Sequence, residues 1–144
     1  MSSFLPDGYC GLYCAACPQY IATKAGKAEA LGMENCRGCK SDEVAASWCR
    51  ICNLKKCARS KGYEFCYECA SYPCEDLEKF RNAPEWPYHI EVYDYMDTIR
   101  KDGKEKWLKG MAVRWSCPSC GQEASWWDLN CSSCGTKLKG YKKP

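Results

Sequence analysis

The chain has 144 residues, of which 15 are cysteine, and a formal net charge of +3. This length allows one domain or two very small ones, and so high a cysteine content is typical of chains cross-linked by disulfides or metals. The hydrophobic fraction of 46% includes those cysteines, which excludes a large apolar core and leaves much of the stability to cross-links.

The first residues contain neither the basic nor the apolar region of a secretory signal, and no apolar run is long enough to cross a membrane. We therefore expect a cytoplasmic protein without a membrane partner, whose thiols stay reduced. The odd number of cysteines and the repeated C-x2-C spacing also favour metal ligands over disulfides.

The positive charge is not an argument for a nucleic-acid partner. A zinc ion held by four thiolates carries about −2, because its ligands lose their protons on binding. Three such sites would move the formal charge from +3 to about −3. The basic C-terminal tail keeps nucleic-acid binding open, but we expect a protein partner instead.

Residues 1–83 are predicted to form a cysteine-rich metal-binding module, in which short helices lie between cysteine knuckles. Helices are expected over residues 18–33, 41–48, 53–62 and 73–82, since each segment carries helix start or stop signals. Gly26 weakens the first of them. Little strand pattern occurs before residue 112.

Eleven cysteines lie in this module, and all are candidate metal ligands. They form a C-x3-C-x2-C triplet, a C-x2-C pair and two C-x2-C-x4-C runs that resemble a short internal repeat. Two four-ligand sites would use eight thiols and leave three. The set comprises Cys10, Cys14, Cys17, Cys36, Cys39, Cys49, Cys52, Cys57, Cys66, Cys69 and Cys74.

The opening triplet has the spacing of radical-forming iron–sulfur enzymes, and Cys17-Pro18 is a ferredoxin-like pair. The chain is too short for the barrel of the first class and lacks the C-x2-C-x2-C-x3-C-P run of the second. Zn2+ and a non-standard iron–sulfur cluster both stay open as cofactors of this module. The triplet either closes a site with a distant cysteine, such as Cys57 or Cys74, or leaves one position free.

Residues 84–112 are predicted to be a connecting segment with one long amphipathic helix over 88–110. Apolar residues recur there at three- and four-residue steps from Ile90 to Trp107. The only histidine, His89, is expected at the surface or as a cap at the start of this helix. No catalytic constellation can be assembled around one histidine, so the sequence assigns no catalytic residue and leaves open whether the protein is an enzyme.

Residues 113–144 carry two C-x2-C-G knuckles, Cys117/Cys120 and Cys131/Cys134, which resemble those of small zinc ribbons. Four thiolates at this spacing predict a tetrahedral Zn2+ site inside a three-stranded ribbon, with SWWD as a strand. The site has no open coordination position, so we expect the zinc to be structural.

The segments YCGLYCAACPQYIATK, CRGC and WCRICNLKKCARSKGYEFCYECASYPCEDLEKF resemble domain-of-unknown-function family 3795. This family comprises small cysteine-rich prokaryotic proteins, some of which also carry a C-terminal zinc ribbon. The resemblance covers about residues 8–82. It implies metal binding and a cytosolic prokaryotic origin, but no activity is established for the family, so no catalytic role can be carried over from it.

Together these patterns predict a small metal-stabilised α+β fold with short helices, one long helix and a C-terminal ribbon. The expected function is that of a cytosolic multi-metal-binding protein with mainly structural metals, serving as an interaction module. The alternative is an iron–sulfur redox or catalytic protein with its cluster in the N-terminal module.

Overall fold

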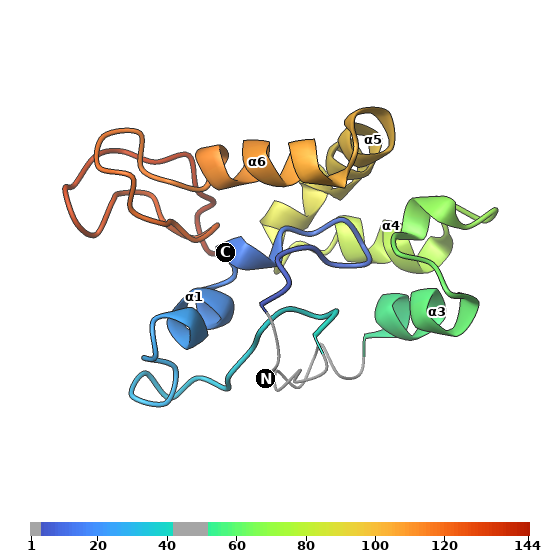
Figure 1. Ribbon diagram of the computed structural model, residues 1–144, viewed down its shortest axis with the longest axis horizontal. Coiled ribbons are helices and arrows are strands. Elements are labelled where there is room, and N and C mark those ends of the chain that lie inside the picture. The colour runs from blue at the N-terminus through green and yellow to red at the C-terminus, as the bar shows by residue number, and fades with distance from the viewer. Residues whose placement is uncertain (1–3, 42–51) are drawn as a thin grey trace.

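The computed structural model describes residues 4–41 and 52–144 (Figure 1). Regular structure within these two ranges is helical, with five α-helices and three short 3-10 turns. The strands expected of an α+β protein do not form there, because the antiparallel pairing is limited to isolated bridges. The described part is therefore a small, mostly helical protein.

The first helix is shorter than the sequence predicts. A 3-10 turn, η1 (Cys14–Ala16), leads into helix α1 (Pro18–Lys24). The chain leaves the helix at Gly26, whose φ of +71° lies in the left-handed region that glycine adopts without strain. The predicted extension to residue 33 is replaced by turns, and the helix predicted over 41–48 lies outside the described residues apart from Ser41.

The next two predicted helices are confirmed. Helix α3 (Asn53–Lys61) ends at Gly62, whose φ of +73° makes a left-handed C-cap. A 3-10 turn, η2 (Cys66–Glu68), follows, and helix α4 (Glu75–Arg81) begins directly after Cys74. Cysteines therefore lie in or beside each of these elements.

The long helix predicted over 88–110 is wrong as a single helix. It consists of a 3-10 turn, η3 (Pro87–Glu91), and helices α5 (Val92–Asp102) and α6 (Lys104–Arg114). Gly103 separates the two helices with φ 91° and ψ 155°, a conformation that only glycine adopts readily. The chain consequently changes direction between α5 and α6 (Figure 1).

The break also changes which side chains are buried. Helix α5 buries Val92, Met96 and Ile99, spaced as one helical face requires, whereas Ile90 is 42% exposed. Trp107 on α6 is 2% exposed. The apolar stripe is thus divided between two helices that pack against each other.

One aromatic core joins the N-terminal segment, the connecting helices and the C-terminal segment, where the expected three-stranded ribbon is reduced to isolated bridges. Its buried members come from all three parts of the chain, and most of them are aromatic. They are Tyr13, Ala16, Phe65, Tyr88, Tyr95, Met96, Ile99, Trp107, Trp115 and Trp126. A smaller cluster surrounds Leu54, Leu77 and Val92 and includes Cys10.

None of the helices that the structure describes is both long and apolar enough to span a bilayer.

Candidate metal centre

The two C-terminal knuckles have matching backbone geometry. Gly121 N donates to Cys117 O and Gly135 N donates to Cys131 O, both at 2.9 Å. The two glycines have φ values of +78° and +76°, so each turn uses a backbone conformation that favours glycine. A β-bridge closes each knuckle, Ser116 to Glu123 in the first and residues 130 and 137 in the second.

The knuckles bring four sulfur atoms together at one end of the molecule. The Sγ atoms of Cys117 and Cys134 lie 3.5 Å apart, as do those of Cys120 and Cys131, and all four lie within 4.8 Å of one another. In a tetrahedral site with Zn–S bonds of about 2.3 Å, neighbouring sulfurs lie about 3.8 Å apart. The C-terminal cluster therefore fits a metal ion such as zinc without rearrangement of the backbone.

Hydrogen-bond donors around the cluster favour the thiolate form of two ligands. The backbone N–H of Cys120 and then that of Ser119 lower the pKa of Cys117 to about 6. The Thr136 hydroxyl and backbone lower the pKa of Cys134. Because a metal binds the thiolate and not the thiol, these donors reduce the cost of deprotonating the site.

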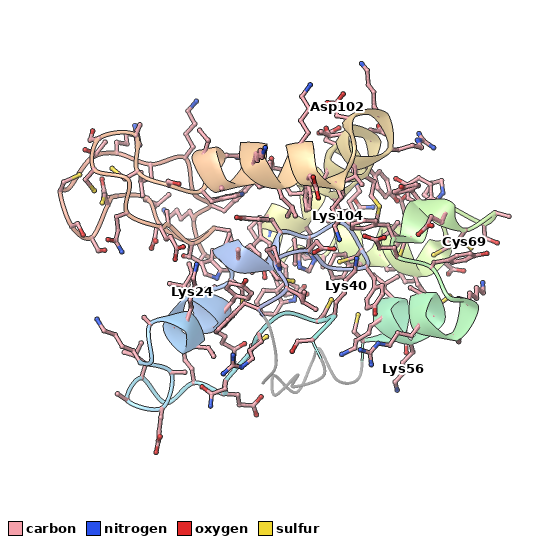
Figure 2. The ribbon with its side chains drawn as sticks, viewed as in Figure 1. Lys24, Lys40, Lys56, Cys69, Asp102 and Lys104 are labelled. Carbon is pink, nitrogen blue, oxygen red and sulfur yellow. The ribbon has the colours of Figure 1, made fainter. Side chains whose placement is uncertain are left out.

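The residues between the knuckles form a turn that docks the cluster. The predicted SWWD strand is absent, because Ser125 N donates to the Asp128 carboxylate at 2.8 Å and Asp128 N donates to Ser125 O at 3.1 Å. Trp126 N donates to Ala16 O at 3.2 Å. The cluster is thereby attached to the segment that follows Cys14. Lys24 on α1, labelled in Figure 2, also forms an ion pair of 3.0 Å with Glu123, which lies between the two knuckles.

Two thiols of the opening triplet, Cys10 and Cys14, lie beside Cys39, whereas the third, Cys17, lies beside Cys36. The Cys14 thiol hydrogen-bonds Cys39, and this bond lowers the pKa of Cys39 to about 7. Burial raises the pKa of Cys17 to about 11, with the Cys36 thiol adding to the effect. Burial also raises the pKa of Cys10, and its thiol neighbours Cys39, Cys52 and Cys66 add to the shift.

A second group of thiols surrounds Cys66, between α3 and α4. Burial raises the pKa of Cys66 to about 12, and nearby thiols add to this shift. These neighbours are Cys74, Cys57, Cys52 and Cys69. Cys52 thus lies next to both groups, since it also interacts with Cys10.

Within residues 4–41 and 52–144, the C-terminal cysteines are the one set of three or more candidate ligands whose donor atoms all lie within 4.8 Å. Every cysteine in these ranges is a thiol and not a disulfide. Cys49 lies outside the described residues. The N-terminal cysteines therefore gather in groups that are less compact than the C-terminal cluster.

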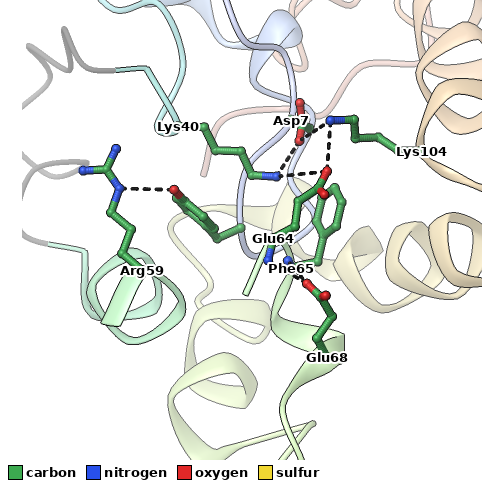
Figure 3. Close-up of polar contacts among 8 residues, drawn as sticks. Asp7, Lys40, Arg59, Glu64, Phe65, Glu68 and Lys104 are labelled. Carbon is green, nitrogen blue, oxygen red and sulfur yellow. Dashed lines mark hydrogen bonds and ion pairs between the residues drawn. The ribbon is translucent and has the colours of Figure 1, made fainter. Parts of the chain in front are cut away.

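A charged network that was not predicted from the sequence holds the cysteine-bearing loops together (Figure 3). Lys40 Nζ lies 2.6 Å from Asp7 Oδ2 and 3.9 Å from Glu64, and Lys104 Nζ lies 2.9 Å from Glu64. Asp7 is 2% exposed, and the Lys40 ammonium lies 3.9 Å from the centre of the Phe65 ring. Because Lys40 follows Cys39 and Glu64 and Phe65 precede Cys66 in the sequence, the network fixes these loops relative to each other and to the start of α6.

His89 is buried, at 6% exposed, so its predicted surface position is wrong. Its ring stacks on Phe80 with centroids 3.7 Å apart, and its Nδ1 lies 2.9 Å from Phe80 O. Since a carbonyl only accepts, Nδ1 donates to Phe80 O. His89 therefore caps a carbonyl in the last turn of α4 and not the start of its own helix, where it was expected. Burial lowers its pKa from 6.5 to about 4, which keeps the ring neutral.

Residues 7–79 match the family profile described as Protein of unknown function (DUF3795), and this range is just over half of the chain. The chain belongs to this family.

The DUF3795 region contains all eleven N-terminal cysteines together with α1, α3 and most of α4. The C-terminal cluster and helices α5 and α6 follow it in the chain. Comparison with curated proteins and with solved structures returned no match. The protein is thus a cysteine-rich DUF3795 member with a C-terminal four-cysteine group that fits a metal ion.

Proposed function

We propose that this DUF3795 protein is a cytosolic multi-metal-binding protein whose metals are mainly structural and whose folded surface serves as an interaction module. The C-terminal cluster binds Zn2+ through Cys117, Cys120, Cys131 and Cys134 in this proposal. The N-terminal module binds further metal ions through its own cysteines. Metal thiolates would then stabilise short helices that bury too little apolar surface to fold alone.

The observation that carries this proposal is the sulfur geometry of the C-terminal cluster. The shortest sulfur separations are 3.5 Å, close to the spacing in a tetrahedral zinc site. Four protein ligands fill that coordination sphere, so the ion has no position left for a substrate or a reactive water. A closed site does no chemistry itself and acts through the fold that it stabilises.

The exposed apolar side chains support the interaction role. Val113, near the end of α6, is 78% exposed, and Leu129 in the C-terminal segment is 42% exposed. A photo-crosslinker placed at position 113 in the source cells should give a discrete adduct with a second protein. Recovery of the uncrosslinked chain alone would contradict the interaction role.

Metal analysis of protein purified without oxygen tests the metal assignment. We expect a colourless protein that contains zinc, and we expect its circular dichroism signal to collapse when a strong chelator removes the metal. An unchanged spectrum after complete metal removal would contradict the structural role. A brown protein with broad absorption near about 400 nm would instead place an iron–sulfur cluster in the N-terminal module.

A further inference from the structure

The strongest unassigned feature is the thiol group between α3 and α4. Cys57 lies on α3, Cys66 begins η2, and Cys74 directly precedes α4. Leu54 and Leu77 pack in one buried cluster against which Cys66 and Cys74 also pack. This packing brings together thiols that are up to 17 residues apart in the sequence.

The local backbone holds Cys66 and Cys69 in a tight turn. Cys69 N donates to Cys66 O at 3.1 Å, and Tyr72 N donates to Cys69 O at 3.1 Å. Such a C-x2-C turn is the usual zinc knuckle. Cys69 lies close enough to Cys66 to raise the pKa of its thiol, and so do Cys57 and Cys74.

A lysine lies beside two of these thiols. Lys61 Nζ is 3.8 Å from Cys69 Sγ, and the neighbouring thiols of Cys57 and Cys69 raise the pKa of Lys61. Four thiolates around a divalent ion carry about −2, and an adjacent ammonium offsets part of that charge. Lys61, which lies beside both thiols, is therefore suitably positioned to act as an outer-sphere partner of a metal site.

We propose that Cys57, Cys66, Cys69 and Cys74 bind one Zn2+ ion tetrahedrally, with Lys61 donating to the thiolates of Cys57 and Cys69. Each ligand gives its proton to water as the zinc binds, and four Zn–S bonds form without oxidation or reduction. This inference refines the proposed function, because it assigns one site among the eleven N-terminal cysteines.

The four sulfurs are less compact than those of the C-terminal cluster. Rotation about a cysteine χ1 moves Sγ between staggered positions, and the proposal requires such rotation at these cysteines when the ion binds. Cys52 lies beside Cys66 but also beside Cys10. We assign Cys52 to the other thiol group, with Cys10, Cys14 and Cys39.

Zinc stoichiometry of full-length variants tests the assignment. Cys57→Ser and Cys69→Ser should each lower the bound zinc by one equivalent, and the double variant should lose the same single equivalent because both residues serve one ion. Ser60→Ala, on the exposed side of α3, is the control and should keep all of its zinc. Full zinc content in the double variant would overturn the proposal.

A spectroscopic measurement on the unaltered chain guards against variants that do not fold. In protein loaded with cadmium-113, one metal resonance should couple to the β-protons of Cys57, Cys66, Cys69 and Cys74. Coupling of a single resonance to a mixture of these cysteines with Cys10 or Cys14 would overturn the proposal. Cys117→Ser is read separately: if that variant keeps all its zinc, the C-terminal assignment fails while this one stands.

The role of Lys61 has its own control on the same helix. Lys61→Gln should weaken zinc affinity at this site by about tenfold, as is typical for loss of an outer-sphere partner, with stoichiometry unchanged at saturating zinc. Lys56→Gln, which alters an exposed lysine elsewhere on α3 (Figure 2), should leave the affinity unchanged. Equal zinc affinities in the Lys61→Gln and Lys56→Gln variants would show that Lys61 has no role at this site.

Discussion

The rings of Tyr88 and Trp126 stack with centroids 3.9 Å apart and planes 11° from parallel. Tyr88 lies in η3 and Trp126 lies between the two C-terminal knuckles, so this contact attaches the C-terminal cluster to the helical part. Both residues belong to the aromatic core. The cluster is therefore packed onto the helical part and is not held by a tether alone.

Trp126→Ala should destabilise the protein while leaving its zinc in place. Trp126 is 5% exposed, and truncation of a buried tryptophan typically costs about 3–5 kcal/mol. The sulfur ligands come from the knuckles, so zinc stoichiometry should not change. Urea unfolding of the zinc-loaded protein measures the loss, and Trp86→Ala, at a 45% exposed site, should cost much less. Equal losses in the two variants would contradict the docking role of Trp126.

Asp7→Asn should be costly because it leaves the Lys40 ammonium without its closest partner. The two side chains are 3% and 11% exposed, and breaking a buried pair typically costs about 3–5 kcal/mol. Lys24→Gln breaks an ion pair that is more than half exposed and should cost at most about 1 kcal/mol. Both free energies of unfolding are measured at equal metal loading, and a smaller loss for the Asp7 variant would show that the network of Figure 3 does not hold the loops.

His89 should make stability depend on pH in the acid range. Its pKa falls from 6.5 to about 4 in the folded protein, so the unfolded chain binds the proton more readily. The stability associated with the neutral His89 ring is fully present above pH 6.5 and is lost as the pH falls toward about 4. The loss in the free energy of unfolding amounts to about 3 kcal/mol.

The matched variant is His89→Gln, which can still donate to Phe80 O but does not titrate. The difference in unfolding free energy between wild type and variant should shift by about 3 kcal/mol across that pH range. Subtraction removes the acid sensitivity that both proteins share through their carboxylates and thiolates. A difference that does not change with pH would contradict the buried neutral state.

Gly121→Ala should weaken zinc binding at the C-terminal cluster. An added Cβ meets no atom within 4 Å, so the cost comes from the φ of +78° and is about 1–2 kcal/mol, or about tenfold in affinity. Gly110→Ala in α6 also enters open space but at a helical φ, and it should slightly stabilise the protein. Competition with a metal indicator measures both affinities, and an unchanged affinity for Gly121→Ala would contradict the knuckle geometry.

Local patterns were the most predictable from sequence. The C-terminal knuckles were predicted because each C-x2-C-G turn depends on adjacent residues, and α3 was predicted because Gly62 ends it. The break at Gly103 was missed, since a glycine inside a helical pattern costs only about 1 kcal/mol. Its backbone conformation depends on how α5 and α6 pack.

The sequence did not predict which distant cysteines lie beside one another in the fold. Cys10 and Cys14 lie beside Cys39 while Cys17 lies beside Cys36, although adjacency suggested that the whole triplet would act together. The pairing follows from contacts such as Lys40 to Asp7, which join residues 33 positions apart. Cysteine spacing shows which thiols can bind metal, but the loops decide which of them share an ion.

The zinc content of Cys131→Ser, compared with that of wild type and of Ser132→Ala, tests the central claim most directly. We predict that Cys131→Ser loses one equivalent of zinc and that Ser132→Ala, next to it in the same knuckle, loses none. X-ray absorption of the wild-type protein should show zinc bound by four sulfurs at about 2.3 Å. Full zinc content in Cys131→Ser would contradict the account.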